Sequence, residues 1–194
     1  SLGMAAASPE KLQALGREAE EAMLAATGGV NTHKGALYSF ALLLSALGRC
    51  LAEGGGPFET AAAIAAALPP ASGTHGSTVR AQCGSVRQEA VSGFSTARHM
   101  RGLLESAGPL SALVWAMSRL DDSTLVYRGG PQGLAYVRRR AAELLRLPEE
   151  ALPPALEALD DDLMARRLSP GGSADLLALT LFFRSLDFWT ELSV

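Results

Sequence analysis

The residues whose types and spacing could bind a charged ligand lie in one polar run near the start of the sequence. Residues 28–35 read Gly-Gly-Val-Asn-Thr-His-Lys-Gly, between two segments with helical periodicity. Glycines let backbone N–H groups approach a ligand closely, and the N-terminus of the following helix favours negative charge. The run therefore predicts an anion or nucleotide site. The residues assigned to this site are Gly28, Gly29, Asn31, Thr32, Lys34 and Gly35.

A second polar cluster begins with Asp121 and Asp122. An apolar helical pattern predicts a helix over 109–121, so these carboxylates are expected at its C-terminus, where each opposes the helix dipole by about 0.3–1 kcal/mol. Arg128, Gly129 and Gly130 follow closely and add a cation beside flexible backbone. The cluster could hold a divalent cation with a bound phosphate, or orient a hydroxyl nucleophile. The alternative is a solvated helix end with an arginine partner.

The third cluster is residues 169–175, Ser-Pro-Gly-Gly-Ser-Ala-Asp. Proline in a first helical turn followed by two glycines leaves several N–H groups at the positive end of a helix dipole, which suits a phosphate or pyrophosphate. The alternative is a helix start that packs closely at its glycines. The residues assigned here are Ser169, Gly171, Gly172, Ser173 and Asp175.

Two weaker candidates complete the set. Arg87 and Glu89 place a cation and a carboxylate in a glycine-flanked stretch, where a structural salt bridge is the alternative, and His75 lies between Thr74 and Gly76. The sequence has no P-loop, GxSxG, GxGxxG or HExxH motif, so serine or cysteine nucleophilic catalysis has no support.

Composition limits the class of protein. The 194 residues carry a net charge of −3, so there is no basic footprint for nucleic acid or for a membrane surface. The two cysteines cannot form a disulfide framework or a four-cysteine zinc site, and they suit a reduced cytoplasmic protein. The longest apolar run, 36–47, is shorter than the roughly 18–20 residues that a bilayer requires. We therefore expect a cytoplasmic protein.

Helix formers dominate the sequence and strand-type alternation is absent, which predicts an all-α fold. We expect one helical-bundle domain over 12–190, with the polar clusters at helix termini. Residues 1–11 are expected to be a flexible N-terminus, with the residues before Met4 added by cloning. Asn31 or Thr32 is expected to cap the second helix. Later helices are expected over 98–107, 109–121, 131–147 and 153–167 and from Pro170, while 79–94 is ambiguous.

Taken together, the polar clusters resemble the triphosphoribosyl-dephospho-coenzyme A synthase family, in the same order and over about residues 12–184. The resemblance implies that ATP and 3′-dephospho-coenzyme A are joined and adenine is released. The product is the precursor of the prosthetic group on the acyl carrier protein of citrate lyase or malonate decarboxylase. The matching motifs are residues 28–35, 74–76, 89–94, 121–130 and 168–178.

The resemblance also implies roles for the polar side chains that bind the substrates. Lys34 and Arg128 would bind the triphosphate together with the glycine-rich helix starts. Magnesium is expected with ATP, held through Asp121 or Asp122.

The reaction itself is a ribosyl transfer, in which the 2′-hydroxyl of dephospho-coenzyme A attacks C1′ of the ATP ribose. Glu89 and Asp121 are the candidates to stabilise an oxocarbenium-like transition state and to take the hydroxyl proton. His33 or His75 would protonate the departing adenine.

The sequence departs from the family pattern in two ways. Family members usually carry an upstream Thr-Pro-Lys-Pro-Gly-Leu-Val-Asp type motif that is not found before Leu12, so we expect the chain to form the C-terminal two-thirds of the family fold. The missing segment could be a separate polypeptide. Thr124, Tyr127 and Gln88 stand where the family commonly has Asn, His and Gly.

Three other functions stay open. A non-catalytic nucleotide- or coenzyme A-binding fragment would bind ATP without releasing adenine. A related ribosyl transferase would release adenine only with a different acceptor. A structural helical partner would gain no stability from nucleotides. A homo-oligomer is compatible with each of these.

Overall fold

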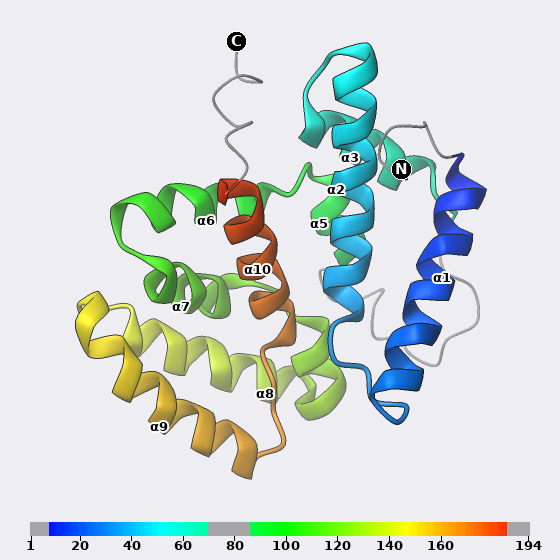
Figure 1. Ribbon diagram of the computed structural model, residues 1–194. Coiled ribbons are helices and arrows are strands. Elements are labelled where there is room, and N and C mark those ends of the chain that lie inside the picture. The colour runs from blue at the N-terminus through cyan, green and yellow to red at the C-terminus, as the bar shows by residue number, and fades with distance from the viewer. Residues whose placement is uncertain (1–7, 70–85, 186–194) are drawn as a thin grey trace. The chain divides into compact units, whose positions relative to one another are not determined.

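The computed structural model describes residues 8–69 and 86–185, and it is helical with no strand among those residues (Figure 1). The all-α prediction is confirmed for this part of the chain. The described residues fall into two compact units. The first comprises 8–69, 86–95 and 183–185, and the second comprises 96–182.

The first unit is built around one apolar helix. α1 (Pro9–Ala26) and α2 (Lys34–Glu53) precede α3 (Pro57–Ala67) and the short α5 (Val86–Val91). α2 packs against the other three helices, and its length and composition would also suit a membrane span. Because its packing partners come from the same unit, α2 serves here as a core helix. The most buried apolar side chains of this unit are Leu42, Leu43, Ala46, Ala61, Ala65, Ala90 and Phe94.

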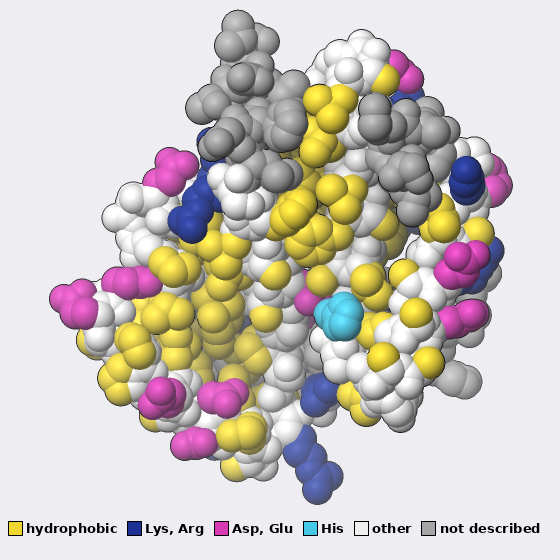
Figure 2. Space-filling view, viewed as in Figure 1, with side chains coloured by type: hydrophobic (Ala, Val, Ile, Leu, Met, Phe, Trp, Pro, Cys, Tyr) yellow, Lys and Arg dark blue, Asp and Glu magenta, His cyan; other side chains and the backbone are white. Residues whose placement is uncertain are grey.

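The second unit contains most of α6 (Ser95–Ser106), then α7 (Pro109–Arg119) and α8 (Ser123–Leu144). A 3₁₀ turn over Glu149–Ala151 leads into α9 (Leu152–Ala165), and α10 (Gly171–Ser185) follows. Figure 2 shows apolar side chains gathered over α7, α8 and α9 on the face in view.

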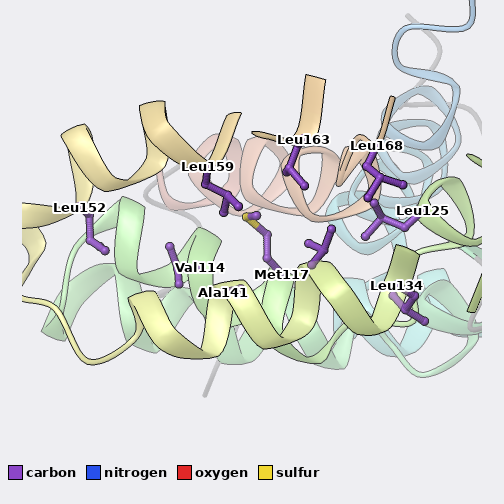
Figure 3. Packing of buried hydrophobic residues seen from close by; sticks show 10 residues of the cluster. Val114, Met117, Leu125, Leu134, Ala141, Leu152, Leu159, Leu163 and Leu168 are labelled. Carbon is purple, nitrogen blue, oxygen red and sulfur yellow. The ribbon is translucent and has the colours of Figure 1, made fainter. Parts of the chain in front are cut away.

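Leucines dominate the core of this unit. In Figure 3, Leu159 and Leu163 of α9 point toward the layer that carries Met117. Burying a leucine side chain stabilises the fold by about 1.5–3 kcal/mol relative to leaving it exposed, so this core holds α7, α8 and α9 as one layer. Its buried members are Val114, Met117, Leu125, Leu134, Val137, Ala141, Leu152, Leu159, Leu163 and Leu168.

The helix boundaries around Asp121 and Asp122 differ from the sequence-based prediction. The helix expected over 109–121 ends at Arg119, and the helix expected from 131 begins already at Ser123. α8 is broken at Gly130, whose φ of 63° and ψ of −169° are not helical, and Pro131 restarts it. The flexible backbone expected at Gly129 and Gly130 is therefore only a break inside a longer helical segment.

The Glu149 side chain caps the N-terminus of α7. Its Oε1 accepts the N–H of Leu110 at 2.9 Å, and its Oε2 accepts the N–H and hydroxyl of Ser111 at 2.8 and 2.6 Å. Desolvation acts to raise the pKa of this carboxyl, but the Ser111 and Leu110 donors outweigh it and lower the pKa. A carboxylate at this end of a helix is also favoured by the dipole.

We expect Glu149→Gln to lower Tm at neutral pH, with a difference from wild type that shrinks on acidification. A lowered pKa adds stability above the ordinary range of a glutamate, and this stability is lost as the pH falls through the folded-state value. Thermal melts from pH 7 down to about pH 4 measure the difference. Glu150→Gln changes an exposed neighbour and is the control. A difference that grows toward acid pH would contradict this assignment.

Candidate functional site

Asp122 joins the starts of two helices that are far apart in the sequence. It is the N-cap of α8, where Oδ1 accepts the N–H of Thr124 at 2.8 Å and of Leu125 at 3.3 Å. Its Oδ2 accepts the N–H of Gly172, in the first turn of α10, at 2.9 Å. One carboxylate thus brings the second and third polar clusters into direct contact.

This carboxylate is held away from water, with only 2% of the Asp122 residue exposed. Burial raises its pKa, against the lowering effect of the backbone N–H groups of Thr124, Leu125, Gly172 and Ser173. Both helix dipoles point their positive ends at the carboxylate, which stabilises a buried charge that has no cation partner among these contacts. The Asp122 carboxylate is therefore stabilised by backbone N–H groups at the N-termini of two helices.

Close packing around the contact explains the nearby glycines. A Cβ on Gly172 would lie 3.0 Å from Asp122 Oδ2, and a Cβ on Gly129 would lie 2.4 Å from Leu168 Cδ2. Gly133 leaves room for the same leucine, where a Cβ would lie at 2.9 Å. Leu168, just before the third cluster, is therefore packed over the middle of α8.

One prediction about this region is wrong, and another is only partly matched by the structure. Asp122 does not end a helix, where it would oppose the dipole; it begins α8, where the dipole favours a carboxylate. The start of α10 does not present a full set of free donors, because Gly172 donates to Asp122 and the N–H groups of Ser173 and Ala174 lie on the Pro170 carbonyl at 3.1 and 3.3 Å. One of the N–H groups predicted to bind a phosphate is thus already bonded to Asp122, and phosphate binding at this helix start stays a prediction.

The other members of these clusters lie in more open positions. Asp121 is exposed and pairs with Arg138, whose Nη2 is 2.8 Å from Asp121 Oδ1. Arg128 is exposed on the first half of α8, next to the break at Gly130. The predicted members at the start of α10 are half-buried or buried: Ser169, Gly171, Gly172, Ser173 and Asp175. The Ser173 hydroxyl is buried and has no hydrogen-bond partner among the described residues.

The carboxylates predicted to hold magnesium already have partners within the protein. Both oxygens of Asp122 already accept backbone N–H groups, and Asp121 is paired with Arg138. Within 8–69 and 86–185, no group of three or more acidic, cysteine or histidine side chains is placed to hold a metal ion.

The polar run of the first unit forms the turn between α1 and α2. Gly28 and Gly29 have φ of 65° and 85°, which favour glycine. The N-cap of α2 is His33, which makes no side-chain capping bond, so the prediction of Asn31 or Thr32 as the cap is wrong in position. Asn31 Oδ1 nevertheless accepts the Lys34 N–H at 3.1 Å. The turn thus leads into α2 with its polar residues at the helix start.

Side chains around this turn have partners of their own. The Lys34 ammonium pairs with Glu20 of α1, and both side chains are about one-third exposed. Thr32 Oγ1 lies 2.6 Å from His33 Nδ1, and both residues are exposed. Gly35 is inside α2. The Lys34 cation and the His33 ring are therefore accessible at one helix start.

α5 carries the remaining described candidates. Arg87 donates to the Leu68 carbonyl at 2.6 Å, and Glu89 is half-buried. Tyr38 was missed by sequence reasoning; burial raises its pKa, while Arg87 is close enough to act in the opposite direction. Tyr38 lies one turn after Lys34 on the same face of α2, which is the one signal that could have identified it. His75 lies outside the described residues.

Comparisons with known proteins agree on one family. A family model described as ATP:dephospho-CoA triphosphoribosyl transferase (CitG) matches residues 1–193. A Klebsiella pneumoniae 2-(5″-triphosphoribosyl)-3′-dephosphocoenzyme-A synthase is 38% identical over 92% of this chain and 70% of its own length. A relative from Albidiferax ferrireducens, named as a probable synthase of the same kind, is 39% identical. The match covers 91% of this chain and 67% of the relative.

A solved structure has the same fold. This crystal structure, from Archaeoglobus fulgidus and provisionally assigned as a triphosphoribosyl-dephospho-coA synthase, has a TM-score of 0.61 at 18% identity. It covers 90% of this chain, which in turn covers 87% of it. The family-model match and the curated relatives together show that the chain belongs to the ATP:dephospho-CoA triphosphoribosyl transferase family.

Proposed function

We propose that this chain transfers the triphosphoribosyl group of ATP to the 2′-hydroxyl of 3′-dephospho-coenzyme A. The observation that carries the proposal is the family match over residues 1–193, which includes every polar cluster identified from the sequence. In the reaction the 2′-oxygen forms a bond to C1′ of the ATP ribose, and the bond from C1′ to adenine breaks. The hydroxyl proton is released and adenine takes up a proton.

The residues of the first unit that support substrate binding are at the start of α2. Lys34 offers a cation at the end of a turn that begins with two glycines of positive φ, which suits a phosphate. Its partner Glu20 keeps the ammonium in place in the absence of a ligand. His33, exposed in the same turn, is our candidate to protonate the leaving adenine.

In the second unit, Arg128 is the exposed cation beside the α8 break. Asp121 and Glu89 remain our candidates for the general base. We propose that magnesium enters bound to the phosphates of ATP, whose oxygens are ligands that this ion prefers. The product would serve as precursor of the prosthetic group of citrate lyase or malonate decarboxylase.

The test is adenine release from ATP and magnesium, with and without 3′-dephospho-coenzyme A, followed by mass analysis of the coenzyme product. We expect adenine only with the acceptor present, and a triphosphoribosyl mass increment on the product. ATP-induced thermal stabilisation without adenine release would indicate a binding protein. Adenine release with another acceptor alone would indicate a different ribosyl transferase. Either result would overturn the proposal.

Lys34→Ala should lower kcat/KM for ATP about 10–100-fold, because a charge-assisted hydrogen bond to phosphate contributes about 1.5–3 kcal/mol. Loss of the partly exposed pair with Glu20 should cost the fold little. Initial rates over a range of ATP concentrations measure the effect. Lys11→Ala removes an exposed lysine of α1 outside the polar run and should leave the rate unchanged. Equal rates for both variants would exclude Lys34 from ATP binding.

A further inference from the structure

Asp122 occupies a position in which a carboxylate could be taken for a metal ligand, but its contacts define a different role. Its oxygens are within 3.3 Å of three backbone N–H groups from two helices. Three of the roughly four lone-pair sites of the carboxylate are therefore occupied by N–H groups of α8 and α10. The residue is also 98% buried, since only 2% of it is exposed.

The contact joins two segments that both carry predicted substrate-binding residues. Asp122 lies at the start of α8, which carries Arg128 and the break at Gly130. Gly172 lies in the first turn of α10, just after Ser169 and Pro170. Leu168, packed against α8 at Gly129 and Gly133, is an apolar contact between the same two segments. The two segments are thus held together by the polar contact of Asp122 and by the apolar contact of Leu168.

We propose that Asp122 is a positioning residue, a buried clamp that fixes the start of α10 on the start of α8 so that both segments can bind ATP, and that it is not a ligand of magnesium. The inference rests on the proposed function, because ATP is taken as the substrate. Asp122 affects the binding of ATP only by holding the segments of Arg128 and Ser169 in place. It does not contact the metal.

Two variants loosen the clamp in different ways. Asp122→Asn keeps the shape, but its NH₂ group cannot accept an N–H, so one helix start loses its acceptor. Gly172→Ala keeps the charge and the α8 cap, while its Cβ, 3.0 Å from Asp122 Oδ2, pushes the carboxylate away from α10. Glu149→Gln is the matched control, because it weakens a carboxylate cap of the same kind on α7, outside every polar cluster.

The experiment is calorimetric titration with ATP, once in EDTA and once in magnesium, well below the Tm of every variant. We expect Asp122→Asn and Gly172→Ala to raise the Kd of ATP at least tenfold, by the same factor in both buffers, and to lower kcat/KM in the adenine assay. Glu149→Gln should lower Tm with no change in Kd or kcat/KM.

Three results would overturn the inference. Unchanged ATP affinity in both variants would show that Asp122 contributes to the stability of the fold and does not affect ATP binding. A loss of affinity confined to the magnesium buffer, with an unchanged or raised Tm in EDTA, would make Asp122 a metal ligand. A wild-type protein that binds no ATP would overturn the inference and the proposed function together. A wild-type protein that binds ATP but releases no adenine would overturn only the proposed function, and the titration would still decide the role of Asp122.

Discussion

Asp122→Ala is expected to lower the free energy of unfolding by about 2–4 kcal/mol. The change removes the N-cap of α8, which contributes about 0.5–2 kcal/mol. It also removes the charged acceptor of the Gly172 N–H, and a hydrogen bond to a charged group contributes about 1.5–3 kcal/mol. Urea unfolding followed by circular dichroism measures the loss.

The neighbouring residue gives a matched control. Asp121→Ala removes an exposed carboxylate whose partner is Arg138, so it should cost at most about 1 kcal/mol. Similar losses for the two variants would show that the backbone contacts of Asp122 are not what stabilises this region.

The pH dependence of the Asp122→Ala effect follows from the direction of the pKa shift. Burial raises the pKa of Asp122, so its contribution is largest below the ordinary pKa of an aspartate and declines as the pH rises through the folded-state value. The stability difference between wild type and Asp122→Ala should therefore be smaller at pH 8 than at pH 5. Glu149 should show the opposite trend, since its pKa is lowered.

Gly130→Val is expected to lower the free energy of unfolding by about 3 kcal/mol and to reduce adenine release. The φ of 63° and ψ of −169° at Gly130 belong to a backbone region that is almost confined to glycine. A β-branched side chain would force the break between the two halves of α8 to change, which moves Arg128 relative to Pro131. Tm and the initial rate of adenine release measure the two effects.

Gly102→Val is the control for the Gly130 variant. Gly102 lies in α6, in the same unit, with no atom within 4 Å of an added Cβ and no positive φ. Valine there should change stability by less than about 1 kcal/mol. A Gly130 variant as stable as the Gly102 variant would show that the break is not held by its backbone conformation.

The helical fold could be predicted because local signals agree with it. Helix formers fill the sequence, and proline marks the starts of α3 and α7. The same local signals failed at Gly129 and Gly130, which fall between the helices predicted over 109–121 and 131–147. Packing against Leu168 requires a small residue at Gly129 and so explains a helical glycine there, but this contact lies far away in the sequence.

The polar clusters were identified from residue types, whereas their contacts were not. Asp122 and Gly172 are 50 residues apart, and no periodicity links them. Similarly, Lys34 pairs with Glu20, 14 residues earlier on another helix. Spacing within one element indicates shared faces, but contacts between elements depend on how the helices pack.

The distance along the chain that the Asp122 clamp spans has a consequence for folding kinetics. Contacts between residues so far apart require a large loop to close, and such contacts generally form after the local helices. The clamp is therefore expected to be absent from the folding transition state, so that loosening it speeds unfolding while folding keeps its rate. The Asp122 contact between α8 and α10 then determines the unfolding rate of the second unit. The local helices determine its folding rate.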